Sequence, residues 1–329
     1  MSKASARMLV VSAMLVQTSS IPVDQIGALT KAQAAISVLP RVEVPDRSRG
    51  TTIPTRVTHP SAAGTYPVVV WSPFAGGSKD DYTSVVRQWA AAGYIVVQTS
   101  HFDEPLPGGS WGPEQTRNLP NRFLDLVTVL DHLDGLIPAS TGVQPDTSRI
   151  GVGGHYVGSV SALALGGMFD PSSDRRYSDA RPLAFVAVSP TGREGTLSEA
   201  TWASIDRPVL VITGPQDLSA RTSHEGLWRT EAYRFMPAGG KYLVLFDGAG
   251  GTYLDAYELG PELGLLAEAD ARAKRAVPVG ERAGVVQCLA EETLAFWDLY
   301  VKGDSAARAR LRQQPACPAA KGLFSIEWK

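Results

Sequence analysis

Residues 149–158 read Arg-Ile-Gly-Val-Gly-Gly-His-Tyr-Val-Gly, and this stretch decides the fold. Its first half alternates isoleucine and valine with glycine, as expected of a strand that is buried on both faces. Gly154 and Gly158 would permit a sharp turn here, because glycine lets two backbone segments approach closely. The small and apolar residues of 157–166 then suit a buried helix. The stretch therefore predicts a strand, a tight turn and a helix in immediate succession.

Strands and helices alternate on both sides of this stretch. Further apolar runs predict strands at 67–71, 94–97, 184–188, 208–213 and 242–246. Apolar residues at helical spacing predict helices at 82–90, 122–133 and 291–301. Alternating residues at 36–39 and 53–57 predict antiparallel opening strands. Such an order is typical of an α/β fold, with a mostly parallel, doubly wound sheet between two helical layers, α/β/α.

The segment 103–120 is rich in glycine and proline and is the longest expected loop. It leaves the carboxyl end of a predicted strand, which is where ligands bind in folds of this kind.

Composition limits the classes of partner. The chain has 329 residues, 44% of them hydrophobic, and a formal net charge of −2. Without a basic stripe, nucleic acid is not expected as a partner. The longest apolar run, residues 8–16, is too short to span a membrane. Nothing in the sequence indicates an oligomeric state.

The N-terminal 35 residues differ in character from the rest. Lys3 and Arg7 precede the apolar run, and small polar residues follow it, in the order expected of a secretion signal. The alternative is a simple N-terminal arm. Residues 1–35 are therefore expected to be an arm or a signal peptide and residues 36–329 to be one domain, in a secreted or periplasmic protein if the signal functions and in a cytoplasmic one otherwise.

The two cysteines, Cys288 and Cys317, are too few and too far apart for a zinc site. In an exported protein they would suit a disulfide, and two free buried thiols are the alternative. No metal and no cofactor are expected.

Three motifs, at 67–77, 149–155 and 214–217, stand in an order that resembles the serine α/β-hydrolases. The similarity extends over about residues 45–325 and is strongest to the dienelactone-hydrolase and platelet-activating-factor-acetylhydrolase-like branch and the related polyester hydrolases (cutinases). It implies an α/β-hydrolase fold. It also implies a serine nucleophile in a Gly-x-Ser-x-Gly turn, an acid after a later strand and a histidine after the last one.

Two of these three catalytic positions have changed. The nucleophile position holds Tyr156, and the position of the histidine holds Gly251, while the acid remains as Asp217. A phenol has a pKa near 10 in its unperturbed state and is bulky, so acyl transfer through Tyr156 is not expected. The resemblance thus implies a degenerate triad.

Three residues are candidates for catalysis. Tyr156 is either a hydrogen-bond donor or general acid, or a plug that fills the old site. Asp217 either orients Tyr156 or a substrate group, or caps the turn after its strand. His101 follows the strand at 94–97 and is either a replacement base or a solvated loop histidine.

Backbone N–H groups of Phe74 or Ala75, together with that of Val157, are expected to polarise a substrate carbonyl. The aromatic residues Trp111 and Phe74 either line the cleft or pack in the core, and Trp71, within its strand, is expected in the core.

Because both the serine and the histidine of the triad are replaced, by Tyr156 and Gly251, the expected function is non-hydrolytic. The main expectation is a repurposed, cofactor-independent enzyme that performs a cyclisation, isomerisation or elimination on a hydrophobic carbonyl substrate. The first alternative is a catalytically inert, ligand-binding pseudo-hydrolase. The second is an esterase or polyester hydrolase with atypical residues.

Overall fold

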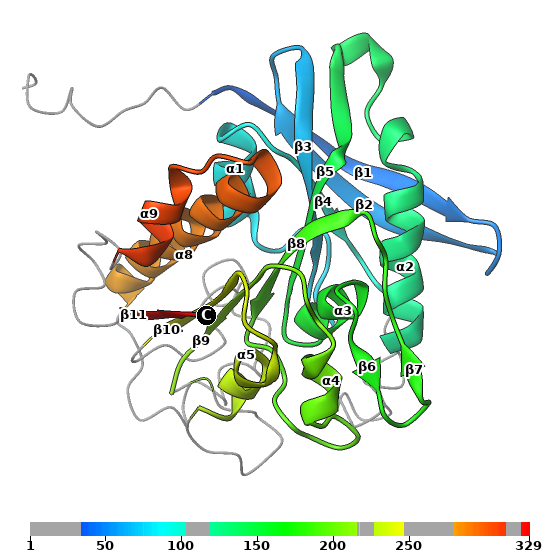
Figure 1. The fold of residues 1–329 in the computed structure, drawn as a ribbon. Helices are drawn as coiled ribbons and strands as arrows, with labels where there is room; N and C mark the ends of the chain where they lie inside the picture. Colours follow the sequence, from blue (N-terminus) through cyan, green and yellow to red (C-terminus); the bar gives the residue numbers. More distant parts are fainter. Residues whose placement is uncertain are drawn as a thin grey trace, which may run out of the picture. The chain divides into compact units, whose positions relative to one another are not determined.

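The computed structural model describes residues 34–74, 76–102, 119–215, 217, 227–246, 279–313 and 324–329. Within these residues the main sheet has nine strands, in the order β1-β2-β4-β3-β5-β8-β9-β10-β11 (Figure 1). The strands are β1 (Ile36–Asp46), β2 (Thr51–Pro60), β3 (Gly64–Ser72), β4 (Ile95–Thr99), β5 (Val143–His155), β8 (Pro182–Val188), β9 (Val209–Thr213), β10 (Lys241–Phe246) and β11 (Phe324–Trp328). A small hairpin, β6 (Phe169–Asp170) and β7 (Arg175–Arg176), lies apart from the sheet.

The middle of the sheet is parallel. Strands β4, β3, β5, β8, β9 and β10 pair in parallel with one another in this order. The first two strands pair antiparallel with each other and β2 pairs antiparallel with β4, as β11 does with β10 at the other edge. The parallel strands therefore end at one common edge, and the loops of the candidate site leave from that edge.

Successive side chains of a strand enter opposite faces of the sheet, and both faces are buried. In β3, Val68 and Val70 belong to one hydrophobic cluster, whereas Val69 and Trp71 belong to the other. Because both sets need apolar side chains, the strand reads as a continuous apolar run rather than as an alternating one.

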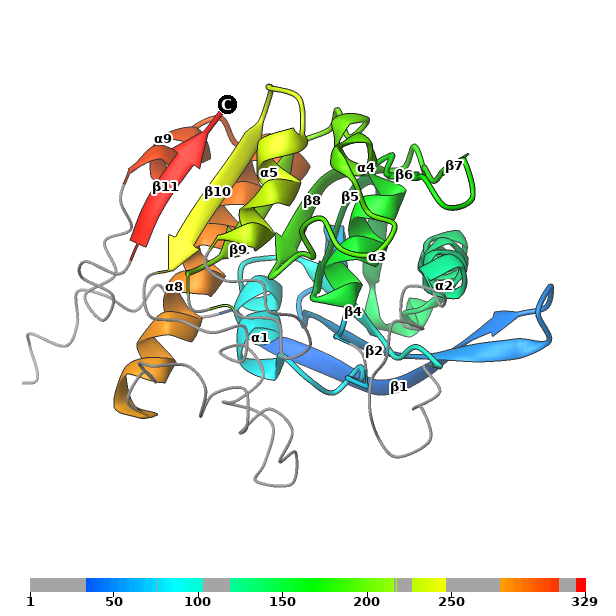
Figure 2. The same ribbon diagram turned by 90° about the horizontal axis from the view of Figure 1, so that it is seen from below.

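The helices form two layers over these faces. Helices α1 (Thr83–Ala91), α8 (Val279–Trp297) and α9 (Ala307–Arg312) lie on one side, and α2 (Leu119–Asp131) and α3 (Val157–Leu165) lie on the other (Figures 1 and 2). Residues of α4 (Glu199–Ala203) and α5 (Glu231–Phe235) join the second cluster. The remaining turns are 3₁₀ at Leu133–Gly135, Ala139–Thr141 and Trp228–Thr230, and π-helical at Asp298–Lys302, directly after α8.

The fold class expected from the sequence is confirmed, including the antiparallel opening strands and the three layers. Some bounds differ. Helix α8 begins twelve residues before the predicted 291, and β11 had not been predicted as a strand. The sequence 324–328 alternates, but such a short edge strand gains its hydrogen bonds only from β10, which sequence periodicity does not reveal.

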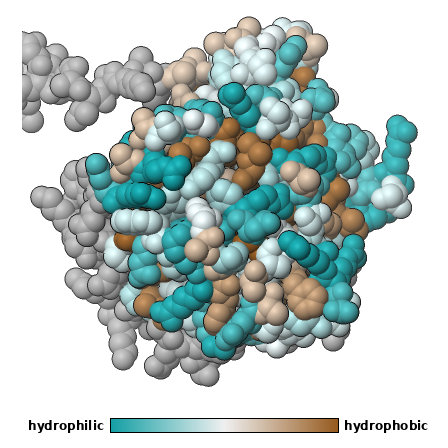
Figure 3. Space-filling view, in the orientation of Figure 1, coloured by the Kyte–Doolittle hydropathy of each residue, from teal (hydrophilic) through white to brown (hydrophobic). Residues whose placement is uncertain are grey.

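No helix in the described part of the chain combines the length and apolar character that a membrane span requires. On the face shown in Figure 3, hydrophobic side chains appear in small groups between hydrophilic ones. The predicted loop 103–120 lies outside the described residues except for its last two, which open α2, and the N-terminal arm or signal stays a prediction.

Candidate functional site

The turn between β5 and α3 has the geometry of a strained elbow. Tyr156 has φ 50° and ψ −120°, a conformation that side-chain-bearing residues rarely adopt. A Cβ added to Gly154 would lie 2.3 Å from the carbonyl of Gly158, and one added to Gly158 would lie 2.2 Å from the carbonyl oxygen of Ser72. Both glycines are therefore required for this close approach.

Tyr156 is held from three sides. Its N–H donates a hydrogen bond of 3.0 Å to the carbonyl of Val188, at the end of β8. Its ring lies 4.4 Å from that of His155, and the guanidinium of Arg229 lies 4.5 Å from the ring centroid. The half-buried tyrosine is thus fixed by backbone and ring contacts together.

Arg229 stands between Tyr156 and Asp217. Its Nε lies 3.0 Å from Oδ1 of Asp217, and its Nη1 donates to the carbonyls of Ser189 (2.8 Å) and Pro190 (3.2 Å). The hydroxyl of Thr213 donates to Oδ2 of Asp217 over 2.8 Å. Asp217 is buried, and it forms its ion pair with the same arginine that contacts the Tyr156 ring.

His101 lies in a second polar cluster. Its Nε2 is 2.9 Å from Oγ of Ser72, the last residue of β3, and its Nδ1 is 2.7 Å from Oδ2 of Asp125 in α2. The hydroxyl of Thr99 is 3.2 Å from the same Nε2. The His101 side chain is fully buried, so it is not a solvated loop histidine.

Two arginines complete this second cluster. Nη2 of Arg49 donates to Oδ1 of Asp125 over 2.6 Å, and the same guanidinium pairs with Asp46. Hydrogen bonds from the Ser48 hydroxyl and from Arg49 hold the pKa of Asp46 well below its usual range. Arg122, almost fully buried, donates to the carbonyl of Pro73 (2.9 Å) and lies 3.4 Å from the Ser72 hydroxyl.

The loop after β3 was expected to supply an oxyanion donor. The N–H of Phe74 donates to the hydroxyl of Tyr82 over 3.3 Å, and that hydroxyl is 3.1 Å from Nδ1 of His155. The Phe74 N–H is therefore engaged in this structure. Val157 begins α3, where first-turn N–H groups have no acceptor within the helix.

Three predicted site residues, Ala75, Trp111 and Gly251, lie outside the described residues. Phe74 is buried and meets Tyr82 and His155 edge to face. Trp71 packs against Tyr82 in the core, as expected.

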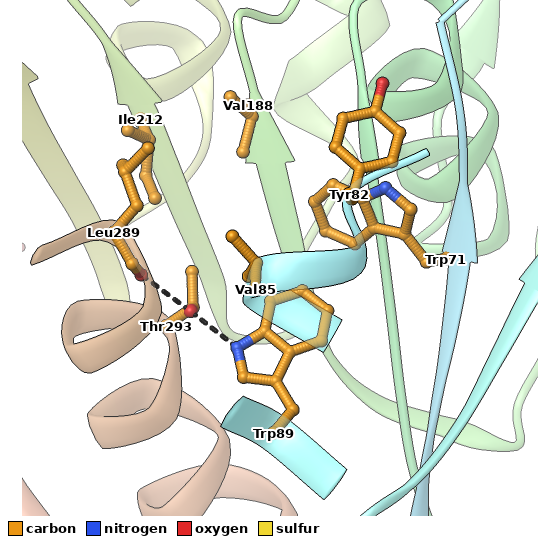
Figure 4. Close-up of a pocket in the computed structure, with 8 residues that line it drawn as sticks. All are labelled: Trp71, Tyr82, Val85, Trp89, Val188, Ile212, Leu289 and Thr293. Atoms are coloured by element: carbon orange, nitrogen blue, oxygen red, sulfur yellow. Dashed lines mark hydrogen bonds between the residues drawn. The ribbon is translucent and has the colours of Figure 1, made fainter. Parts of the chain in front are cut away.

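A cavity of about 10 Å³ lies between the sheet and helices α1 and α8 (Figure 4). The surface that faces the cavity is apolar, although Trp71, Tyr82, Trp89 and Thr293 are among the residues that line it. The indole of Trp89 donates to the Thr293 hydroxyl, which in turn donates to the carbonyl of Leu289. The volume is near the lower limit for one water molecule, so this cavity is not a substrate cleft. Across the described ranges, no group of three or more acidic, histidine or cysteine side chains is placed to hold a metal ion.

The sequence reasoning missed Ser72, Asp125, Arg122 and Arg229. For α2 a signal was present, since Arg122 and Asp125 are three residues apart and fall on the same face as Phe123, Leu126 and Val129. Charged residues within an apolar face are rarely buried unless they are paired. For Arg229 no comparable signal exists, because its partner Asp217 lies in another loop.

No protein-family model matches this chain, and no curated protein is similar to it in sequence. Among solved structures, the chain is similar to a ferulic acid esterase from Streptomyces cinnamoneus, with a TM-score of 0.63 and 19% identity. The match covers 91% of this chain and 97% of that one.

This comparison overturns the non-hydrolytic function expected from the sequence, since the structural neighbour is an esterase. The expectation rested on the elbow and on the end of the last strand alone. In the structure, a serine, a histidine and a carboxylate from three other segments meet in the interior. Sheet order, helical layers and similarity together show that the chain has the α/β-hydrolase fold.

Proposed function

We propose that this chain is a carboxylic-ester hydrolase with atypical catalytic residues, and that it holds the substrate carbonyl beside the elbow at the carboxyl edge of its sheet. The observation that carries the proposal is the backbone strain at Tyr156. The similarity to an esterase structure supports it at the level of the fold.

Backbone strain of this kind indicates that the turn has a functional role. A non-glycine residue in such a conformation costs roughly 1–3 kcal/mol and persists only where the surroundings enforce it. Here the enforcing contacts are the hydrogen bond from Tyr156 to Val188 and the approach of Gly158 to the carbonyl of Ser72. An unused site would be free to lose this turn, because relaxing it would stabilise the protein.

The turn provides what ester hydrolysis requires of a backbone. It directs the start of α3, with its first-turn N–H groups and the positive end of its dipole, towards the edge of the sheet. Preorganised N–H donors that meet a developing oxyanion contribute about 2.7–4 kcal/mol each to lowering the barrier. We place the ester carbonyl at the N–H of Val157.

The substrate we propose has a hydrophobic acyl or alcohol part, as expected from the sequence. The structural neighbour is described as acting on ferulic acid esters, so a hydroxycinnamate ester belongs among the first substrates to test.

The test is hydrolysis of p-nitrophenyl acetate, p-nitrophenyl butyrate and methyl ferulate by the purified chain and by Gly158→Ala. We expect turnover by the wild type. We expect at least a hundredfold loss in the variant, because the new Cβ would displace the elbow and a shift near 1 Å costs about that much.

Gly135→Ala is the matched control, since its added Cβ would meet nothing within 4 Å. Far-UV circular dichroism establishes that all three proteins are folded. If the folded wild type turns over none of the three esters above the rate in buffer, the proposal is wrong.

A further inference from the structure

Ser72, His101 and Asp125 form a hydrogen-bonded chain in the order hydroxyl, imidazole, carboxylate. The distances are 2.9 Å from Oγ of Ser72 to Nε2 of His101 and 2.7 Å from Nδ1 of His101 to Oδ2 of Asp125. These are the contacts by which a base activates a serine and an acid orients the base. Such a set is recognised by geometry and not by its positions in the sequence.

The sheet brings the three residues together. Strands β3 and β4 are parallel neighbours, with Trp71 opposite Gln98. Ser72, at the end of β3, and His101, just after β4, therefore lie at the same edge of the sheet. Ser72 is also the register partner of Gly154 in β5, one strand away from the elbow. The nucleophile of this chain would therefore lie beside the old elbow rather than on it.

The residues around Ser72, His101 and Asp125 determine which atoms of this hydrogen-bonded set donate and which accept. Arg49 occupies Oδ1 of Asp125, which leaves Oδ2 to accept the Nδ1–H of His101. In the neutral imidazole with its proton on Nδ1, Nε2 accepts a hydrogen bond from the Ser72 hydroxyl. Nη1 of Arg122 lies 3.4 Å from the same hydroxyl, and its positive charge favours loss of the hydroxyl proton.

The other histidines in the described part of the chain have different partners. His59 and His132 contact backbone carbonyl oxygens, and His155 contacts the hydroxyl of Tyr82. Of these four, His101 is the one that the structure places between a serine and a carboxylate.

We infer that Ser72 is the nucleophile and His101 the general base and acid of the hydrolase proposed above, on which this inference rests, with Asp125 positioning the imidazole. Oγ of Ser72 attacks the ester carbonyl carbon while its proton passes to Nε2 of His101. The ester C–O bond then breaks, and the alcohol leaves with that proton. Water attacks the acyl-serine and gives a proton to Nε2. The carboxylic acid leaves, and Ser72 recovers its proton.

The burial of Ser72 and the exposure of residues next to His101 and Asp125 in the sequence affect how a substrate reaches this set and how fast it reacts. Phe102 and Leu124, the sequence neighbours of His101 and Asp125, are 62% and 39% exposed. Ser72 itself is fully buried, so attack requires local opening and should be slow compared with that of an open triad.

The first experiment uses the wild-type chain. It is incubated with a fluorophosphonate and digested, and the labelled residue is identified by mass spectrometry. We expect one label per chain, on Ser72. A label on any other serine, or ester turnover without labelling, would overturn the inference.

The second experiment measures kcat and KM of folded variants on the best ester. Ser72→Ala and His101→Gln should lose about a thousandfold or more in kcat, whereas Ser161→Ala, which removes another buried hydroxyl, should not. Asp125→Asn should lower kcat and leave KM unchanged. Asp131→Asn, which removes another carboxylate of α2 that pairs with Arg181 and not with Arg49, should change neither.

The two proposals fail in different ways. If the wild type hydrolyses esters and folded Ser72→Ala keeps more than a tenth of its kcat, the nucleophile is elsewhere and the proposed function stands. If the wild type hydrolyses no ester, the proposed function itself is wrong.

Discussion

The guanidinium of Arg229 lies 4.5 Å from the centroid of the Tyr156 ring, and it joins that ring to Asp217 through a 3.0 Å ion pair. In a serine hydrolase a histidine connects the acid to the nucleophile. Here an arginine and a tyrosine stand in that line, and neither transfers a proton readily at neutral pH. We expect this line to be a structural support, in keeping with the proposal that the nucleophile is another residue.

Removing the guanidinium should destabilise the protein strongly. Arg229→Leu leaves the Asp217 carboxylate buried without its cation, and breaking such a pair typically costs about 3–5 kcal/mol. Arg193→Leu is the control, because Arg193 pairs with Glu231 at the surface and should change stability by less than about 1 kcal/mol. Urea unfolding measures both variants, and equal losses would contradict a supporting role for Arg229.

Because of the strain at Tyr156, we expect glycine to give a more stable protein than alanine at this position, the reverse of the usual order within a helix. Both substitutions lose the ring contacts, but glycine adopts φ 50° without strain. Tyr156→Gly should therefore be about 1 kcal/mol more stable than Tyr156→Ala. Within α3 the order should reverse, with Ser161→Ala about 1 kcal/mol more stable than Ser161→Gly. Thermal unfolding of the four variants tests this, and the same order at both positions would show that the elbow is unstrained.

Glu292 should make stability fall as pH rises. Burial, with a smaller contribution from Glu291, raises its pKa from 4.5 to about 7, and one carboxylate oxygen has no hydrogen-bond partner among the described residues. The folded state thus favours the neutral carboxyl. Its stabilising contribution is complete below pH 4.5 and is lost as the pH rises through 7. The contribution is of the order of 3 kcal/mol, from about 1.4 kcal/mol per pKa unit.

The test compares Glu292→Gln with the wild type in urea between pH 4.5 and 8. The variant should gain on the wild type as the pH rises and exceed it at pH 8. The exposed neighbour provides the control, since Glu291→Gln should follow the wild type closely. A constant difference between Glu292→Gln and the wild type at every pH would contradict the prediction.

Cys288 is disulfide-bonded and fully buried, and Cys317, the other cysteine of the chain, lies outside the described residues. Cys288→Ala should lower the free energy of unfolding by about 2–4 kcal/mol, because the bond restricts the unfolded chain. Cys317→Ala and the double variant should behave alike if the two cysteines are partners. Intact mass with and without reductant checks the bond, and additive losses in the double variant would show separate roles. A disulfide is consistent with the export predicted from the N-terminal sequence.

The sequence by itself determined the sheet and the elbow. Buried parallel strands such as β3 need apolar side chains on both faces, and the turn at Tyr156 needs Gly154 and Gly158. Local residue patterns therefore predict both the strands and the turn. The same local reading identified Tyr156, Asp217 and His101 as residues at the carboxyl edge.

Only the tertiary structure decided the partners of these residues. His101 meets Ser72 because β3 and β4 are adjacent, and it meets Asp125 because α2 packs its charged residues inward. Arg229 reaches Asp217 and Tyr156 from a separate segment. Hydrogen bonds and ion pairs act over about 3 Å, and which side chains come within that distance depends on how distant segments pack, not on any local pattern.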